Sequence, residues 1–353
     1  MMMEKKILMS GNEAMAEGAV LAGCRFYAGY PITPQNEIPA YLSKRIPESG
    51  GVFIQAESEL GAINMVFGAA ATGERAMTSS SSPGISLKQE GISYIAGAEL
   101  PAVIINVMRG GPGLGNIWPA QSDYFQATRS GGHGDYHSIV LAPSSVQEAY
   151  DLMPEAFDLA DKYRMPVMVL GDGMLGQMME PVVINPKPKI QNPKKPWALT
   201  GCKDRKPNIV KSFFMREGDL EKSNLLLQKK YALIRKKEQY YESMNLTDAK
   251  IILVAYGTMA RIAKSAMDRL RAKGRKVGLI RPITLWPFPR DIFNKLKAQS
   301  SKLKILVIEM SYGQMIEDVK LAVCGKVPVG FLGRSGGGIP SEEDIIKEVN
   351  KLG

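Results

Sequence analysis

Short apolar runs alternate with longer segments of helical period over the first half of the chain. The apolar runs predict strands over residues 52–55, 76–79, 101–108, 139–142 and 165–170. The helical-period segments predict helices that include residues 12–22, 57–72 and 145–163. Strands that alternate with helices of this length indicate a mostly parallel sheet with helices on both faces. Ligands bind such sheets where strands end and loops begin.

The same alternation starts again near residue 249. It predicts strands over residues 250–255, 277–280, 305–308 and 327–332, and helices over residues 259–272, 290–298, 314–323 and 341–351. Between the two series lie a proline-rich connector and a charged helix that we expect over residues 219–244. The fold class is therefore α/β, with two doubly wound, mainly parallel domains. We assign residues 1–183 to the first domain, 184–248 to the connector and charged helix, and 249–353 to the second, smaller domain.

Composition narrows the class of protein. The 353 residues are 45% hydrophobic, which is ordinary for a globular protein. No apolar run approaches the roughly 18 residues of a membrane span, and the start of the chain lacks the pattern of a signal peptide. We therefore expect a cytoplasmic protein without a membrane partner. Cys24, Cys202 and Cys324 are isolated, which argues against a disulfide framework, a metal site or an iron–sulfur cluster held by this chain alone.

The formal charge of +10 is concentrated in the connector. Between Lys187 and Lys211 there are eight Lys or Arg residues and one acid, Asp204. The prolines of this segment favour an extended linker, and a single Trp197 is not the aromatic ladder that is typical of nucleic-acid binding. We expect a solvated linker or a strap that docks to another subunit, and no nucleic-acid partner.

The first informative loop reads YAGYPITPQ and follows an apolar run at residues 25–28. Pro31 and Pro34 fix their own φ and bias Tyr30 and Thr33 away from helix. The segment Tyr30-Pro31-Ile32-Thr33-Pro34, here called the proline shelf, is therefore rigid and presents Thr33 between two stiff points. A simple strand-exit turn is the alternative.

The second loop reads QAESELGA and places Glu57 and Glu59 between a predicted strand and the start of a helix. A carboxylate at a helix N-terminus is favoured by the helix dipole, so a structural role is one interpretation. The other interpretation is a partly buried glutamate that handles a proton, because the apolar residues that follow would raise its pKa.

The third loop reads VMRGGPGLGNIWPAQSD and places Arg109 at a strand end before a glycine-rich segment. Arginine can bind a carboxylate with two hydrogen bonds, although a flexible loop with a surface arginine is the alternative. The glycine spacing does not fit a dinucleotide site.

Other candidate motifs lead to weaker hypotheses. GDG at residues 171–173 could open a diphosphate-binding motif of thiamine enzymes, but the paired asparagine that the motif needs 25 to 30 residues later is missing. There is also no GxxxxGK[ST] phosphate loop. His133 and His137 are too few for a metal site, and we expect structural or exposed roles, with His133 retained as a candidate pocket residue.

Taken together, several segments resemble the α subunit of 2-oxoacid:ferredoxin oxidoreductases, in particular the branched-chain (3-methyl-2-oxobutanoate) type. They are GYPITPQNE, QAESELGAINMVFGAAATGERAMTSSSSPGISL, VMRGGPGLGNIWPAQSDYFQA, GGHGDYHSIVLAPSSVQEAYDL and LGDGMLGQMMEP. VAYGTMAR and LIRPITLWPFP resemble the transketolase C-terminal-like domain that follows the pyrimidine-binding domain in this family.

The resemblance implies oxidative decarboxylation of a 2-oxoacid with coenzyme A and ferredoxin. It implies that this chain binds the aminopyrimidine of thiamine diphosphate, while a β subunit holds the diphosphate and magnesium. It also implies γ and ferredoxin-like δ subunits, with iron–sulfur clusters only in the partner subunits.

The resemblance also assigns roles to residues. Glu59, rather than Glu57, matches the glutamate that shares a proton with the pyrimidine N1′. Tyr30, Pro31, Ile32 and Thr33 match the cofactor-binding shelf, with Thr33 also near the substrate. Arg109 matches the arginine that binds the substrate carboxylate.

The substrate follows from the loop after Arg109. Ile117 and Trp118 offer apolar surface where relatives that act on 2-oxoglutarate carry hydroxyl groups, so we expect a branched aliphatic 2-oxoacid. The same chemistry on 2-oxoglutarate or pyruvate is one alternative, and a non-catalytic scaffold subunit is another.

Overall fold

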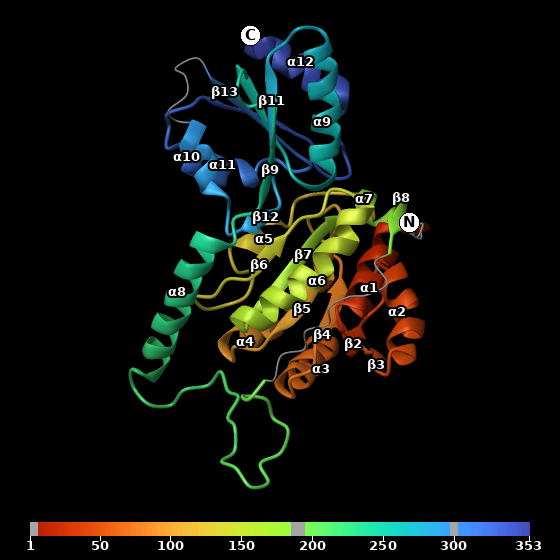
Figure 1. Ribbon diagram of the computed structural model, residues 1–353, viewed down its shortest axis with the longest axis vertical. Coiled ribbons are helices and arrows are strands. Elements are labelled where there is room, and N and C mark those ends of the chain that lie inside the picture. The colour runs from red at the N-terminus through yellow and green to blue at the C-terminus, as the bar shows by residue number, and fades with distance from the viewer. Residues whose placement is uncertain (1–5, 185–194, 297–302) are drawn as a thin grey trace, which may run out of the picture.

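The computed structural model describes residues 6–184, 195–296 and 303–353, and these residues form two α/β units (Figure 1). The first unit is built on a seven-stranded sheet. Its strands, in spatial order, are β12 (Thr284–Trp286), β6 (Ile139–Leu141), β7 (Pro166–Asp172), β5 (Ala102–Met108), β4 (Ala76–Ser80), β2 (Phe26–Gly29) and β3 (Val52–Gln55). All neighbouring strands are parallel except for the edge strand β12. The expected doubly wound, mainly parallel architecture is confirmed.

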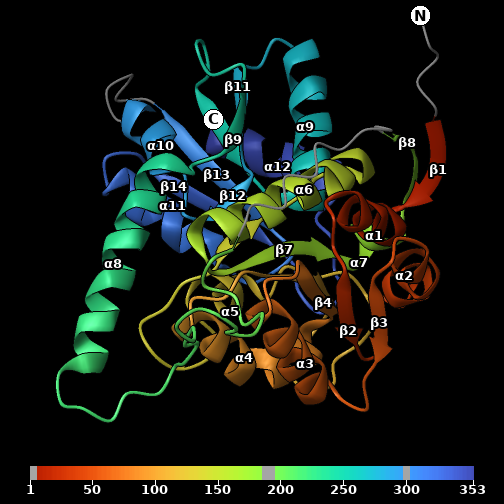
Figure 2. The ribbon, with the colours of Figure 1, turned by 60° about the horizontal axis from the view of Figure 1, so that its bottom comes forward.

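Helices cover both faces of the first sheet. On one face α1 (Gly11–Leu21) packs against α2 (Glu37–Glu48) and α6 (Val146–Tyr163), and on the other α3 (Glu59–Ala71) packs against α4 (Ser82–Gly97). Figure 2 shows α1 and α6 above the strands and α3 and α4 below them. Two shorter helices, α5 (Tyr124–Thr128) and α7 (Gly173–Gln177), lie in the loops after β5 and β7. An antiparallel pair, β1 (Lys6–Ser10) and β8 (Met179–Val183), joins the two ends of this unit.

The second unit has a five-stranded sheet with four parallel strands. Its spatial order is β14 (Val329–Gly333), β13 (Lys304–Glu309), β10 (Ile251–Val254), β11 (Val277–Pro282) and the antiparallel edge strand β9 (Tyr241–Met244). Alternate residues of β10 enter different cores, because Ile252 and Val254 face one side and Ile251 and Leu253 the other. One core is covered by α9 (Gly257–Ala272) and α12 (Glu342–Leu352), and the other by α10 (Arg290–Leu296) and α11 (Met315–Val323).

The charged helix is shorter than the sequence pattern predicts. The helix α8 (Asp219–Lys237) ends after three basic residues, which the helix dipole favours at a C-terminus. The prediction that it continues to residue 244 is wrong, because Tyr241–Met244 pairs with β11 instead. The two sheets therefore exchange edge strands. β9 precedes residues 249–353 in sequence but lies in the second sheet, and β12 lies within residues 249–353 but pairs in the first sheet.

The described part of the connector, residues 195–218, contains no helix or strand, as its proline content predicts. Lys187, Lys189 and Lys194 lie outside the described residues. The side chain of Lys195 is 6% exposed, and its Nζ lies 2.6 Å from Asp161 Oδ1, near the C-terminal end of α6. This lysine anchors the connector to its own chain rather than offering a surface to a partner.

Candidate functional site

The proline shelf follows β2 and is fixed by side chains from two helices. The carbonyl of Pro34 accepts hydrogen bonds from Asn12 Nδ2 at 2.8 Å and from Gln177 Nε2 at 3.0 Å. Both amides also donate to Glu37 Oε2, at 2.7 and 2.9 Å. The shelf therefore sits in a position that α1, α2 and α7 determine together.

A second set of polar contacts, centred on Gln35, also holds the proline shelf. Gln35 is fully buried, its Nε2 donates to the Tyr30 carbonyl at 3.3 Å, and its Oε1 accepts from Ser79 Oγ at 2.5 Å. Ser79 in turn lies 2.8 Å from the hydroxyl of Tyr27. Sequence patterns did not indicate Asn12, Gln35 or Gln177, because such amides are recognised only once the fold brings them to the shelf.

Arg109 reaches from the end of β5 to the shelf. Its Nη1 donates to the Thr33 carbonyl at 2.9 Å and its Nη2 to the Leu114 carbonyl at 3.1 Å. The side chain is buried, and its Nε has no hydrogen-bond partner within the described part of the chain. The structure thus brings Arg109 and Thr33 together and leaves guanidinium donors available for an oxyanion.

Glu59 is the first residue of α3, where Ser58 caps the helix by accepting from the Gly61 amide at 3.1 Å. Its side chain is 6% exposed, whereas Glu57 is exposed to solvent. Its surroundings are less apolar than expected, because Leu60 is exposed and the buried Lys88 of α4 donates to the Glu59 carbonyl at 3.2 Å.

The carboxylate of Glu59 fits the role of a partner for an aminopyrimidine. It makes no hydrogen bond among residues 6–184, 195–296 and 303–353, and its oxygens are not among the fully buried unpartnered atoms, so the carboxylate is free to accept a hydrogen bond from a ligand. It faces Gly84, where a Cβ atom would lie 2.6 Å from Oε1. The hydroxyl of Ser80 beside it is buried without a partner. Because Gly84 has no side chain, the Glu59 carboxylate and the Ser80 hydroxyl can pack directly against the first turn of α4.

The N-terminus of α4 connects this carboxylate to Arg109. Ser82 Oγ accepts from the Arg109 amide at 3.0 Å and donates to Asp123 Oδ2 at 2.7 Å. Asn106 Nδ2 donates to the same Asp123 oxygen at 2.9 Å. Burial raises the pKa of Asp123, although both hydrogen bonds oppose that shift. These contacts fix the start of α4, and with it Gly84, relative to the end of β5.

The loop after Arg109 closes a pocket between the two domains. Asn116 Nδ2 donates to the Gly336 carbonyl of the second domain at 3.0 Å, and Trp118 packs against Gly337. The pocket has a volume of about 560 Å³, within the usual range for ligand sites. Its wall includes Thr33, Ile117, Trp118, Met174, Met178 and Ile339. Thr33 and Ile117 thus share one mainly apolar pocket, to which the second domain adds Ile339.

His133 does not lie with these residues. It is exposed beside Ser93 and Tyr94 near the C-terminal end of α4 and lines a separate pocket of about 400 Å³ with Phe213. His137 stacks on Trp286 with ring centroids 4.5 Å apart, which is a structural role.

The GDG segment also has a structural role. Asp172 caps α7 by accepting from the Met174 and Leu175 amides, and it accepts from Thr258 Oγ1 of the second domain at 3.0 Å. In the described ranges, no group of three or more His, Cys, Asp or Glu residues could hold a metal ion. None of the helices described is long and apolar enough to cross a membrane.

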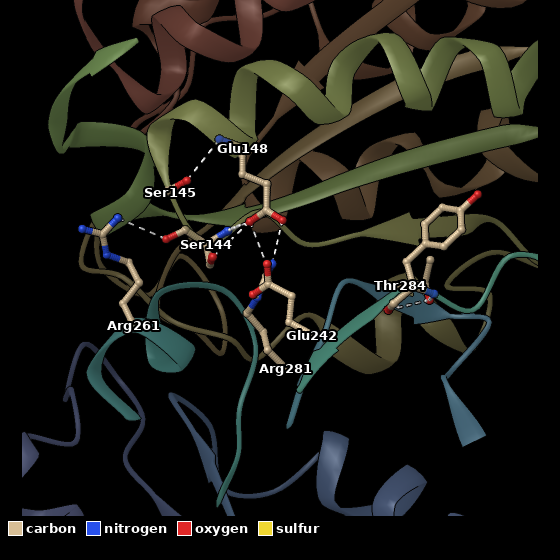
Figure 3. A network of polar contacts seen from close by, with 8 residues as sticks. Ser144, Ser145, Glu148, Glu242, Arg261, Arg281 and Thr284 are labelled. Atoms are coloured by element: carbon tan, nitrogen blue, oxygen red, sulfur yellow. Dashed lines mark hydrogen bonds and ion pairs between the residues drawn. The ribbon is translucent and has the colours of Figure 1, made fainter. Parts of the chain in front are cut away.

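A partly buried ion-pair network links the two domains (Figure 3). Arg281 of β11 donates to both carboxylate oxygens of Glu148 of α6, at 2.8 and 2.9 Å, and to Glu242 of β9 at 2.9 Å. Glu148 also accepts from the amide and hydroxyl of Ser144. This network links α6 of the first domain to β11 of the second.

Comparison with known proteins identifies relatives over nearly the whole chain. Residues 17–246 match the family model described as pyruvate flavodoxin/ferredoxin oxidoreductase, thiamine diP-bdg, and residues 249–345 match pyruvate:ferredoxin oxidoreductase core domain II. The ketoisovalerate oxidoreductase subunit VorB of Methanothermobacter marburgensis is 51% identical over 345 residues, which cover 98% of this chain and 97% of that protein. The 2-oxoglutarate synthase subunit KorA of Methanocaldococcus jannaschii is 39% identical over 365 residues, with 97% and 98% covered.

A solved structure has a similar fold over nearly the whole chain. It is the 2-oxoglutarate:ferredoxin oxidoreductase from Magnetococcus marinus with 2-oxoglutarate, coenzyme A and succinyl-CoA bound. It superposes with a TM-score of 0.88 at 28% identity and covers 99% of this chain, which corresponds to 65% of that longer chain.

Proposed function

The chain belongs to the pyruvate flavodoxin/ferredoxin oxidoreductase family, and from this premise we propose that it is the α subunit of a branched-chain 2-oxoacid:ferredoxin oxidoreductase. The proposed reaction converts 3-methyl-2-oxobutanoate and coenzyme A to 2-methylpropanoyl-CoA and carbon dioxide. Its two electrons reduce two one-electron ferredoxin centres, and the thiol proton of coenzyme A is released.

The observation that carries the proposal is the position of Glu59 and Arg109 on either side of the α4 N-terminus. Thiamine diphosphate, when bound, supplies the carbon nucleophile and the electron sink that decarboxylation needs. Glu59 shares a proton with N1′ of its pyrimidine, since the carboxylate is buried and lacks any other hydrogen-bond partner in the described chain. Arg109 binds the substrate carboxylate through its free donors and orients the 2-oxo group.

The pocket beside Thr33 supports the choice of substrate. Its apolar wall suits an isopropyl group, and a second carboxylate would be buried there without a cation from the described lining residues. The higher identity to the ketoisovalerate oxidoreductase subunit than to the 2-oxoglutarate synthase subunit supports the same choice. Use of 2-oxoglutarate remains the second candidate, because the structural relative carries that substrate.

The proposal requires partner subunits. Asp172 is occupied as a helix cap and interdomain acceptor, which is consistent with the diphosphate and its magnesium ion lying in a β subunit, as the family resemblance implies. Cys24 is buried and Cys202 and Cys324 are exposed at separate places, which is consistent with iron–sulfur clusters in the partner subunits, as the family resemblance implies. A scaffold role without catalysis is disfavoured, because a buried Glu59 and a buried Arg109 are costly to keep without a use.

The test uses the complex that co-purifies through a tag on this chain. Coenzyme A-dependent reduction of a viologen dye is measured with 3-methyl-2-oxobutanoate, 2-oxoglutarate and pyruvate. The proposal predicts the highest kcat/KM for the branched acid. A preference for either other acid would refute the substrate assignment, and no activity in an intact, thiamine-loaded complex would refute the enzymatic role.

A further inference from the structure

A buried lysine that no sequence motif indicated lies directly behind Glu59. Lys88 is in α4, its side chain is 0% exposed, and its Nζ donates to the Glu59 backbone carbonyl at 3.2 Å. This is its only hydrogen bond in the described part of the chain, although an ammonium group has three donors.

Only one charged side chain, that of Glu59, acts on the pKa of Lys88. α4 packs against α3, β5 and β7, and the titratable side chains of these three elements are Glu59 and Asp172. Asp172 is bound to Thr258 and to α7, and it does not act on Lys88. Burial lowers the pKa of Lys88 to about 8, and the carboxylate of Glu59 opposes that shift.

A methionine of similar length would fill the same space without the cost of burying an ammonium group. The chain keeps a cation here nevertheless, next to the one carboxylate that the reaction uses. A charge retained at such a cost, and coupled to a single functional group, is typical of a residue that serves the site rather than the core.

We propose that Lys88 is a positioning residue for cofactor activation, which holds the first turn of α3 through the Glu59 carbonyl and places a buried positive charge behind Glu59. When the cofactor is bound, this positive charge would favour a position of the proton shared with Glu59 that is nearer to N1′ of the pyrimidine. The proposal rests on the function proposed above, because it assumes that Glu59 faces the cofactor.

The wild-type complex gives the first test. The dissociation constant of thiamine diphosphate is measured by titration calorimetry on the cofactor-depleted complex between pH 6.5 and 9.5. The affinity should fall as the pH rises through about 8, where Lys88 loses its charge. An affinity that stays constant over this range would overturn the proposal.

Substitution gives the second test. Lys88→Met should move the acidic limb of the kcat/KM profile to higher pH, because the buried positive charge behind Glu59 is lost. Lys88→Arg keeps the charge and should restore the limb to within about half a pH unit of wild type.

Lys195→Met is the matched control. The side chain of Lys195 is also mostly buried and ion-paired, but it lies beside Gly73, beyond the other end of α3 and about 18 Å from Glu59 along the helix axis. The acidic limb of the kcat/KM profile of Lys195→Met should match that of the wild-type complex. A wild-type limb in Lys88→Met, or an equal shift in Lys195→Met, would contradict the proposal.

A Glu59→Gln complex separates the two proposals. If Glu59→Gln keeps wild-type turnover, the proposed function of Glu59 is wrong. If Glu59→Gln is inactive while Lys88→Met keeps both the wild-type limb and the wild-type cofactor affinity, only the role of Lys88 is wrong.

Discussion

Replacing Gly84 by alanine should reduce turnover about 100-fold while the complex stays assembled. Gly84 lies in the first turn of α4, and a Cβ atom there would lie 2.6 Å from Glu59 Oε1 and 2.1 Å from Ser80 Oγ. The serine hydroxyl can rotate away about a single bond. The glutamate oxygen has to retreat by about 0.8 Å to reach ordinary contact at 3.4 Å.

The magnitude follows from that displacement. Moving a catalytic group by about 1 Å costs on the order of 100-fold in rate. The fold should not suffer, because alanine is favoured over glycine inside a helix by about 1 kcal/mol, which offsets the local crowding. Activity and stability are therefore expected to change independently.

Gly68→Ala is the matched control. Gly68 lies in the interior of α3, and a Cβ atom there meets nothing within 4 Å. This variant should keep wild-type turnover and gain about 1 kcal/mol in stability. Both variants are assayed as tagged complexes for coenzyme A-dependent dye reduction and for the thermal midpoint of unfolding. Wild-type turnover in Gly84→Ala would refute the position of Glu59 opposite this glycine.

Further predictions concern the arginines and the pocket wall. Arg109→Met should lower kcat/KM for the 2-oxoacid about 10- to 100-fold without changing thiamine diphosphate affinity, because a charge-assisted hydrogen bond contributes about 1.5–3 kcal/mol. An unchanged dependence of the rate on 2-oxoacid concentration would show that Arg109 does not bind the substrate. Ile339→Asp should lower kcat/KM for the branched acid at least about tenfold through the lost apolar contact, and equal losses with all three acids would contradict the pocket assignment. Arg281→Met should destabilise the chain by about 3 kcal/mol in denaturant unfolding, because it leaves Glu148 partly buried and unpaired. The exposed Arg269→Met should cost far less stability than Arg281→Met, because surface ion pairs contribute little, and similar losses in both variants would refute the role of the interface.

The sequence predicted the repeating elements because they carry their own signals. The helices of residues 145–163 and 341–351 have strong amphipathic periods, and the buried strands of residues 101–108 and 305–308 are nearly continuous apolar runs. The edge strands were harder. Tyr241–Met244 alternates weakly after a helix, and its strand conformation depends on pairing with β11.

Part of the site was predicted because its residues stand at the ends of strands or the starts of helices. Glu59, Thr33 and Arg109 stand at strand ends or helix starts, so the parallel sheet brings them to one edge. Lys88 and Gln35 lie within or beside helices with no local signal of their role. Their importance comes from the tertiary contacts with Glu59 and with the shelf, which no sequence window contains.

The measurement that tests the central claim most directly compares wild-type and Glu59→Gln complexes loaded with the same amount of thiamine diphosphate. Coenzyme A-dependent dye reduction with 3-methyl-2-oxobutanoate is followed at saturating substrate, after equal subunit content has been verified. The account predicts robust turnover in the wild-type complex and a loss of at least about 100-fold in Glu59→Gln, because general acid–base catalysis contributes about 100- to 10,000-fold. Equal rates in the two complexes would contradict the claim that this chain activates the cofactor.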